Sequence, residues 1–180
     1  MTDPQPLYDL ERCDVRNVLR RLPADVRDAM KEMPYVYLAG GFIRDTIIRE
    51  NPSDIDLFVE AENAAEMQSR VSALLLKLTD VSFRHSTQHF VDTIPMEVDY
   101  KVGGVRFYRT RNAVTVRKRG WKWAVQVVTR WYAEPEKQVS EFDWTVCQVA
   151  IRRRAVVLFD ADDDGANFRG MCAPTFYSDL

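Results

Sequence analysis

The stretch LAGGFIRDTIIRENPSDIDLFVE, Leu38 to Glu60, decides the fold of this chain. The apolar run over residues 35–39 predicts a buried strand, and Gly40 and Gly41 predict a turn into the helix FIRDTIIRE, whose isoleucines share one side. Pro52 ends that helix, and DIDLFV predicts a second strand. The order strand, glycine turn, helix, strand therefore organises the first half of the chain.

Two aspartates, Asp54 and Asp56, stand one residue apart in the second of these strands. Neighbouring residues of a strand point to opposite faces, so both carboxylates are expected on one face while Ile55 points to the core. Two carboxylates this close repel each other unless a proton or a cation lies between them, and hard oxygen ligands select Mg²⁺ or Mn²⁺. We therefore interpret Asp54 and Asp56 as ligands of a divalent metal.

The glycine turn supplies the complementary chemistry. Because Gly40 and Gly41 have no side chains, backbone N–H groups there can approach an anion closely, with the positive end of the following helix behind them. Arg44, one turn into that helix, is placed to contact the same anion through its guanidinium group. A phosphate-binding turn beside a two-carboxylate metal site predicts phosphoryl or nucleotidyl transfer.

The rest of the chain predicts an α+β fold, a mixed sheet with helices largely on one face. Residues 61–79 predict an amphipathic helix, and residues 96–129 predict a series of short strands. A closing hairpin is expected between residues 143–151 and 155–160. The predicted organisation is an N-terminal helical preface packed on the core at 1–34, a catalytic core at 35–160 and a C-terminal tail at 161–180.

Composition is that of an ordinary globular protein: 180 residues, 46% hydrophobic, 29% charged, with a net charge of −2. The N-terminal residues lack the basic-then-apolar order of a signal peptide, and the apolar run VSALLLKL is too short to span a bilayer. Three scattered cysteines indicate neither a disulfide framework nor a zinc site. We expect a cytoplasmic protein.

Positive charge is concentrated in one segment. Residues 100–133 contain no acid and nine bases, and aromatic side chains are interleaved with them. Such a mixture is expected of a surface that holds phosphates and stacks on bases, although a strand-rich segment with one solvated basic face has the same pattern. The bases are Lys101, Arg106, Arg109, Arg111, Arg117, Lys118, Arg119, Lys122 and Arg130, and the aromatic residues are Tyr100, Phe107, Tyr108, Trp121, Trp123, Trp131 and Tyr132.

Taken together, these motifs resemble the nucleotidyltransferase superfamily with the DNA-polymerase-β-type fold. The stretch LAGGFIRDTIIRENPSDIDLF is most similar to the head domain of bacterial-type CCA-adding and poly(A)-adding enzymes, in which Gly-Gly-x-Val-Arg-Asp precedes Asp-Ile-Asp-Leu. The resemblance implies a nucleotidyltransferase core that uses Mg²⁺ or Mn²⁺ and a nucleoside triphosphate. It further implies that Gly40, Gly41 and Arg44 hold the triphosphate, that Asp45 buttresses the loop, and that Asp54 and Asp56 bind the metals.

A second resemblance lies near the end of the chain. EFDWTVCQVAI, residues 141–151, is similar to the family motif Arg-Arg-Asp-Phe-Thr-Ile-Asn-Ala and implies that Asp143 sits in the nucleotide site. Residues 125–150 are also similar to small stand-alone members from phages and large viruses, which implies the cytoplasm of a host cell. The arginine pair of the motif is replaced by Glu141 and Phe142, so contacts to the triphosphate are expected from Arg130 or the basic segment.

Two further departures from the family pattern change specific expectations. Many members carry a third metal carboxylate on a strand where this chain has Gln126, which cannot bind a metal as a charged ligand. Asp143 is the favoured substitute, with Glu97 or Asp99 as alternatives. The chain also lacks the neck, body and tail that hold tRNA in CCA-adding enzymes, so CCA addition is not predicted.

We therefore predict a metal-dependent nucleotidyltransferase that transfers a nucleoside monophosphate from a triphosphate to an acceptor hydroxyl and releases pyrophosphate. RNA, with tRNA as one candidate, is the favoured acceptor because of the basic aromatic segment 100–133. Three alternatives stay open at this point. They are a catalytically inactive nucleotide-binding module that regulates a partner or counters a host factor, a toxin-like enzyme that modifies a protein, and a phosphohydrolase using the same two carboxylates.

Overall fold

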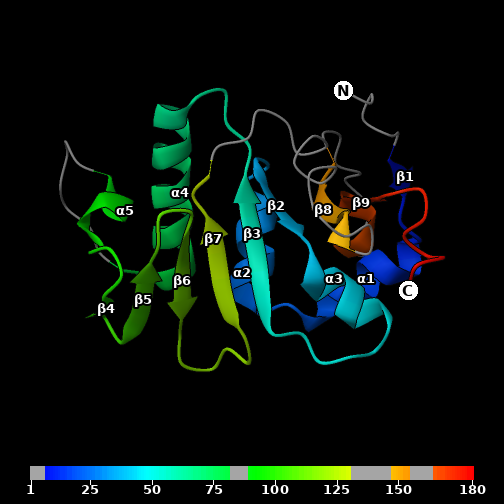
Figure 1. Ribbon diagram of the computed structural model, residues 1–180, viewed down its shortest axis with the longest axis horizontal. Coiled ribbons are helices and arrows are strands. Elements are labelled where there is room, and N and C mark those ends of the chain that lie inside the picture. The colour runs from blue at the N-terminus through cyan, green and yellow to red at the C-terminus, as the bar shows by residue number, and fades with distance from the viewer. Residues whose placement is uncertain (1–6, 82–88, 131–146, 155–163) are drawn as a thin grey trace.

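A single mixed sheet runs through the computed structural model, which describes residues 7–81, 89–130, 147–154 and 164–180. Within these residues nine strands pair in the order β1-β9-β8-β2-β3-β7-β6-β5-β4 (Figure 1). The strands are β1 Tyr8–Asp9, β2 Val36–Ala39, β3 Asp54–Val59, β4 Asp99–Val102, β5 Val105–Arg109, β6 Ala113–Arg117, β7 Ala124–Val128, β8 Val149–Arg153 and β9 Phe168–Cys172.

The strand order brings the two halves of the chain together at β3. Strands β4 to β7 form an antiparallel meander, and β7 then lies parallel to β3, with Asp56 opposite Gln126. On its other side β3 pairs antiparallel with β2, so the end of β2 lies beside the start of β3. Figure 1 shows that β2 and β6 end, and β3 and β7 begin, along the same lower edge of the sheet.

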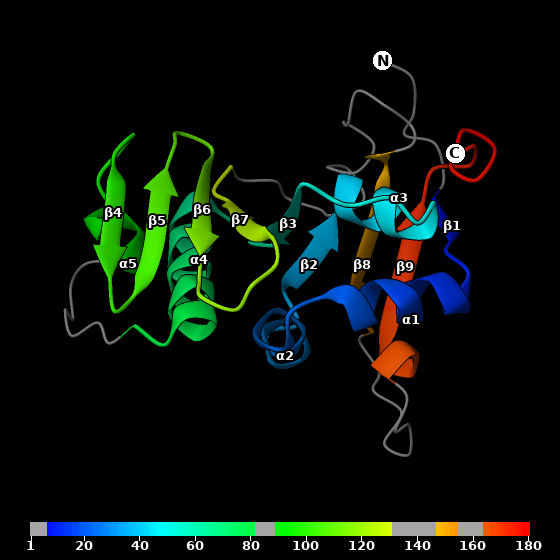
Figure 2. The same cartoon turned by 90° about the horizontal axis from the view of Figure 1, so that it is seen from below.

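Helices cover one face of this sheet. Residues of all the α-helices join one large buried cluster with Ile55, Leu57, Val125 and Val127, the inward-pointing residues of the two central strands. Figure 2 shows α2 beneath the central strands. The predicted α+β class, a mixed sheet with helices largely on one face, is thus confirmed. The helices in the described residues are α1 Arg12–Arg21, α2 Ala24–Glu32, α3 Gly41–Ile47, α4 Ala64–Thr79 and α5 Phe90–Thr93, with a 3₁₀ turn, η2, at Asp164–Asn167.

We call the opposite face, on which the described residues place no α-helix, the open face. A small second cluster lies there, formed by Tyr37, Ala39, Phe58, Ala150 and Met171 from strands β2, β3, β8 and β9. Because residues alternate along a strand, Asp54 and Asp56 share this open face with Phe58. The candidate metal ligands therefore lie on the side of the sheet away from the helices.

The chain ends contribute to the sheet edge instead of flanking it. Strand β1, from the predicted helical preface, pairs with β9, and β9 pairs in turn with β8. Residues 161–180 are therefore not simply a tail, since Phe168–Cys172 are an internal strand of the sheet. Gly170 permits this packing, because a Cβ atom there would lie only 2.5 Å from Leu10 Cδ1.

The predicted closing hairpin is replaced by a different pairing. Strand β8 has β2 on one side and β9 on the other, so both of its edges are occupied and neither is left for residues 155–160. Those residues, like 131–146, lie outside the described part of the chain. Among the described helices, none is both long and apolar enough to cross a membrane.

Candidate nucleotidyl-transfer site

The turn between β2 and α3 depends on a glycine at position 40. Gly40 has φ 87° and ψ −150°, a backbone conformation that is essentially restricted to glycine. A Cβ atom on Gly40 would also lie 3.7 Å from Asp56 Oδ2, so the turn passes directly over that carboxylate. The expected strand, glycine turn and helix are therefore found in the expected order, and they converge on Asp56.

The amide groups of this turn differ in their availability. The Gly40 N–H donates to the Val149 carbonyl at 3.0 Å, which continues the pairing of β2 with β8. The N–H groups of Gly41 and Phe42 belong to the first turn of α3, where no intrahelical acceptor exists. Gly40 is thus required for its conformation, whereas an anion at this turn would be bound by the amides that follow it.

Asp54 and Asp56 lie side by side at the start of β3. Both side chains are half-buried on the open face, while Ile55 and Leu57 between and beyond them are fully buried on the helix side. Ser53 Oγ donates a hydrogen bond of 2.7 Å to Asp54 Oδ1 and orients that carboxylate. The two carboxylates share one face, as the alternation predicts.

Burial raises the pKa of the Asp56 carboxyl to about 7, and the negative charge of Asp54 adds to this effect. At neutral pH, ionising Asp56 beside the Asp54 carboxylate is therefore unfavourable. A divalent cation between the two carboxylates would offset both the burial and the repulsion, and oxygen ligands of this kind suit Mg²⁺ or Mn²⁺. The donor set fits such an ion.

Arg44 is fixed beside the glycine turn. Its guanidinium group donates to Asp45 Oδ1 at 2.6 Å and to Cys147 Sγ at 3.2 Å. The Arg44 Nη2 atom also lies 3.6 Å from the position that a Cβ on Gly41 would occupy. Arg44 is therefore next to the amides of the turn, and Asp45 holds it there. The contact with Cys147, 103 positions away in the chain, is one that sequence patterns gave no means of finding.

The neighbouring strand carries no acid at the position beside the pair. Gln126 on β7 stands in register with Asp56. This is the position at which many members of the resembled family carry a third metal carboxylate. The alternatives Glu97 and Asp99 lie at or next to β4, the far edge strand, about 19 Å away at roughly 4.8 Å per strand. They are too distant to bind the same ion, which leaves Asp143, a residue outside the described part of the chain.

Arg130 does not lie near the glycine turn. It follows β7 by two residues and is four residues beyond Gln126, toward the opposite end of the sheet. At about 3.3 Å per residue this places Arg130 roughly 13 Å from the level of Asp56, whereas Gly40 lies at the lower edge beside the start of β3. The structure thus brings together Gly40, Gly41, Arg44, Asp45, Asp54 and Asp56, and it does not bring Arg130 to them.

The basic segment divides into structural and exposed residues. Lys118 donates to Asp25 at 2.9 Å, Arg109 pairs with Asp92 at 3.4 Å, and both bind backbone carbonyls as well. Trp121 Nε1 also donates to Asp25, and Trp123 stacks edge-on against Phe42, so neither tryptophan is an exposed stacking surface. Among the described aromatic residues expected to stack on bases, only Tyr108 is exposed, with 40% of its surface accessible.

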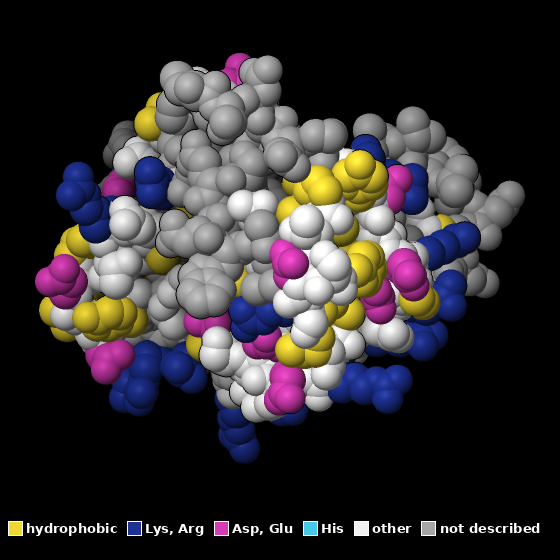
Figure 3. All heavy atoms as spheres, turned by 45° about the vertical axis from the view of Figure 1, so that its right-hand side comes forward, with side chains coloured by type: hydrophobic (Ala, Val, Ile, Leu, Met, Phe, Trp, Pro, Cys, Tyr) yellow, Lys and Arg dark blue, Asp and Glu magenta, His cyan; other side chains and the backbone are white. Residues whose placement is uncertain are grey.

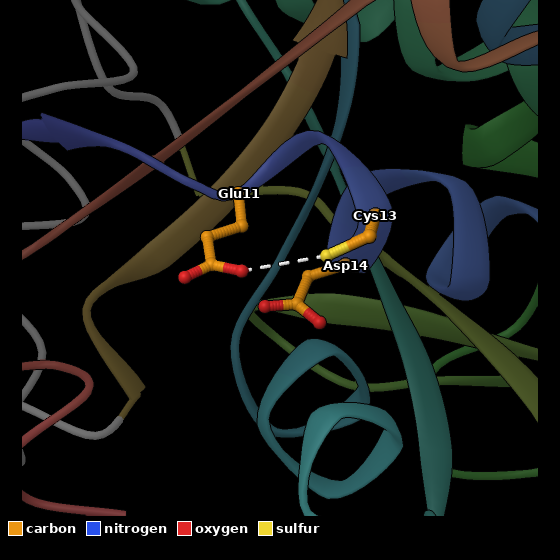
Figure 4. Close-up of side chains that lie close together, drawn as sticks. All are labelled: Glu11, Cys13 and Asp14. Carbon is orange, nitrogen blue, oxygen red and sulfur yellow. Dashed lines mark hydrogen bonds between the residues drawn. The ribbon is translucent and has the colours of Figure 1, made fainter.

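Another group of ligand-type atoms, Glu11, Cys13 and Asp14, lies at the start of α1, a helix that packs against α3 (Figure 4). Cys13 Sγ donates to Glu11 at 3.4 Å, and this hydrogen bond raises the pKa of the Cys13 thiol. Asp14 accepts a hydrogen bond of 2.7 Å from the Tyr177 hydroxyl. The Cys13 thiol and the carboxylates of Glu11 and Asp14 are therefore already engaged in hydrogen bonds within the protein.

Two sets of known proteins match the chain. A family model described as Gad2, Gabija anti-defense 2 family protein, matches residues 9–162, more than four fifths of the chain. No curated protein matches it in sequence. The second set consists of solved structures of CCA-adding enzymes.

The structural matches cover nearly the whole chain at low identity. The Thermotoga maritima CCA-adding enzyme complexed with tRNA aligns with 97% of this chain and 34% of its own, at 14% identity and a TM-score of 0.48. A CCA-adding enzyme in complex with CTP aligns with 97% of this chain and 34% of its own, at 15% identity and a TM-score of 0.48. An apo form of a CCA-adding enzyme aligns with 97% of this chain and 35% of its own, at 15% identity and a TM-score of 0.49. The chain spans about a third of the length of these enzymes.

Proposed function

The chain belongs to the Gabija anti-defense 2 family, and from this premise we propose that it counters a defence system through metal-dependent nucleotidyl transfer. The reaction would move a nucleoside monophosphate from a nucleoside triphosphate to an acceptor hydroxyl and release pyrophosphate. The observation that carries the proposal is the meeting of Asp54, Asp56 and the glycine turn at one edge of the sheet, with Gly40 lying against Asp56.

Each group at this edge has a role in the proposed reaction. Asp54 and Asp56 would hold the divalent cation, which, when bound, neutralises phosphate charge and activates the attacking hydroxyl. The amides after Gly40 and the guanidinium group of Arg44 would bind the triphosphate, and Asp45 would keep Arg44 oriented. The hydroxyl oxygen attacks the α-phosphorus, the bond to the bridging oxygen breaks, and pyrophosphate leaves. The hydroxyl proton would pass to Asp143 or to solvent.

RNA is the acceptor class that the chain favours. The exposed bases of segment 100–133 offer a positively charged surface next to the site, and nucleic-acid binding depends mainly on such phosphate contacts. tRNA is one candidate within that class. Figure 3, in which the right-hand side of Figure 1 comes forward, shows Lys and Arg side chains projecting from the lower rim of the molecule with Asp and Glu side chains among them.

The test is transfer of label. The protein is incubated with each of four α-labelled nucleoside triphosphates, Mg²⁺ or Mn²⁺, and a pool of cellular RNA and protein. The matched variants are Asp54→Asn with Asp56→Asn, and Asp28→Asn, which removes an exposed acid from α2 on the helix side. We expect label in RNA with the wild type and Asp28→Asn but not with the double variant. Label in protein alone would instead identify a toxin-like protein-modifying enzyme.

A second candidate function rests on Gln126. Because a neutral amide stands beside Asp56 where an acid is expected, the chain can also be interpreted as a nucleotide-binding module without catalysis that counters a defence by binding. If the protein is such a module, its Asp56→Asn variant would still bind a triphosphate, and the protein would release no pyrophosphate with any acceptor. Metal-dependent release of pyrophosphate rules it out, and release of free nucleotide without labelled acceptor would identify a phosphohydrolase.

A further inference from the structure

Three bases form a row across the outer strands of the sheet. Lys101 on β4 stands in register with Arg106 on β5, and Arg106 stands in register with Arg117 on β6. All three side chains are exposed, whereas their strand neighbours Val105 and Val116 are buried against the helices. We call Lys101, Arg106 and Arg117 the basic row.

The basic row continues the line of the candidate metal site. Asp54 on β3 is in register with Ala124 on β7, and the next position in the β6–β7 register places Arg117 beside Ala124. The alternation of buried residues puts the basic row on the same open face as Asp54. At roughly 4.8 Å per strand, Arg117, Arg106 and Lys101 lie about 10, 14 and 19 Å from β3. Ala124, the one residue between Arg117 and Asp54 on this line, is a small buried residue.

The charges of the basic row are not neutralised by protein within the described residues. None of the three bases forms an ion pair there, although Lys118 next to them is paired with Asp25. Like charges directly opposite each other on paired strands are unfavourable, so such a row is expected where an external anion compensates it. The row lines an open pocket of about 430 Å³ together with Lys118 and Arg119. Asp99, two residues before Lys101 on β4 and in register with Tyr108, is an exposed acid on this face.

An exposed aromatic ring accompanies the row. Tyr108 is two residues from Arg106 on β5, points to the same open face, and stands in register with Thr115, which precedes Arg117 by two residues. A ring beside regularly spaced cations is the combination that binds single-stranded nucleic acid, because phosphates meet the cations while a base stacks on the ring. A double helix would not offer its base faces in this way.

We propose that the basic row and Tyr108 form the acceptor track of the protein, which holds a single-stranded RNA end with its terminal hydroxyl directed toward Asp54. This inference rests on the proposed nucleotidyl transfer for its purpose, and it adds the path, the residues and the single-stranded form of the acceptor. The RNA crosses β4, β5 and β6 on the open face, and its end points from Arg117 toward β3.

Binding can be measured without catalysis. Fluorescence anisotropy follows a labelled, unstructured RNA of about ten nucleotides, within the usual range of single-strand site sizes, at several salt concentrations. The triple variant Lys101→Gln, Arg106→Gln, Arg117→Gln should bind at least about tenfold more weakly and should lower the slope of log affinity against log salt by about 2, or roughly 0.7 per phosphate contact. The control Arg12→Gln, Arg20→Gln, Lys31→Gln removes equal charge from α1 and α2 and should leave that slope unchanged.

Tyr108 provides a test that charge cannot mimic. Tyr108→Ala should weaken RNA binding by about fivefold or more without changing the salt slope, and Tyr108→Phe should restore the affinity because the ring still stacks. Equal affinity of Tyr108→Ala and the wild type overturns the stacking role. Equal affinity of the wild type for the matched RNA duplex overturns the single-stranded form.

The outcomes separate this inference from the proposed function. If the wild type transfers label while the triple variant binds RNA as tightly as the control, the acceptor track is wrong and nucleotidyl transfer stands. If RNA binding depends on the basic row but no triphosphate yields pyrophosphate, the transfer reaction fails and the RNA track stands. If the triple variant loses both RNA binding and label transfer while the control variant keeps them, the acceptor track and nucleotidyl transfer are both supported.

Discussion

The acidic pair on β3 and the basic row on β4 to β6 occupy the same face of the same sheet, yet their surroundings are opposite. Asp54 and Asp56 are half-buried on one strand with a single residue between them, and burial together with the charge of Asp54 raises the pKa of Asp56. Lys101, Arg106 and Arg117 are exposed on three different strands, where water screens them. The pair is therefore expected to respond strongly to substitution, pH and metal, whereas the row affects stability weakly and ligand binding strongly.

The largest expected effect comes from neutralising the buried pair. Asp56→Asn keeps the shape of the side chain but removes a charged metal ligand, so metal-dependent release of pyrophosphate should fall by at least about 100-fold, the scale for losing one group that stabilises transition-state charge. Pyrophosphate release with Mg²⁺ measures this loss. If the activity of Asp56→Asn stays within about threefold of the wild type, Asp56 is not a metal ligand.

The next effect is on stability as a function of pH. Because the pKa of Asp56 is about 7 in the folded protein and near 3.8 when unfolded, the folded state binds more protons between these values. The free energy of unfolding should therefore fall as pH rises from about 4 to about 7, by on the order of 4 kcal/mol at most. Thermal melts without metal measure this fall, and Asp56→Asn should flatten it.

Added Mg²⁺ sharpens the same experiment. A cation between the carboxylates favours their charged forms, so the stabilisation by Mg²⁺ should grow as pH rises through 7 and should be absent in Asp56→Asn. Equal stabilisation at pH 5 and pH 8 would show that the ion binds elsewhere.

The acidic pair and the basic row each have a glycine nearby, and the two glycines can be compared. Gly40 adopts φ 87° and ψ −150° beside Asp56, and Gly104, in the β4–β5 turn beside the basic row, adopts φ 78° with no atom within 4 Å of a Cβ. Gly104→Ala should cost about 1 kcal/mol for its left-handed backbone alone. Gly40→Ala should cost roughly 2 to 3 kcal/mol, because its conformation is more restricted. Denaturant unfolding of the two variants measures the difference, and equal costs would contradict the special role of the Gly40 turn.

Local patterns predicted the central part of the fold well. Strand β3 coincides with the predicted segment DIDLFV, and strands β4 to β7 fall within the strand series predicted over 96–129, because period-two alternation is strong where one face of a strand is buried. The side-by-side carboxylates follow from the same rule. What alternation could not reveal was which strands are neighbours, so the pairing of β8 with β9 and the place of residues 168–172 inside the sheet were missed.

Side-chain partners across the chain were also beyond reach of the sequence. Trp121 and Trp123 look like stacking residues among bases, but Asp25 on α2 and Phe42 on α3 engage them. Likewise, the Gly40 N–H donates a hydrogen bond to the Val149 carbonyl, although a glycine at the end of a strand suggested an amide that is available to an anion. These contacts join positions about 80 to 110 residues apart, and no local periodicity encodes such distances.

The smallest effect is expected in the basic row, and its sign is the informative quantity. Arg106 lies between Lys101 and Arg117 in the register, so Arg106→Glu exchanges two like-charge neighbours for two opposite ones. Opposite charges on paired strands contribute roughly 0.2 to 1 kcal/mol each, so the variant should unfold at a slightly higher denaturant concentration than the wild type. The same substitution should weaken RNA binding more than Arg106→Gln, because it places a negative charge among the phosphates. A row retained for stability would lose both properties together, whereas a row retained for a ligand gains stability as it loses affinity.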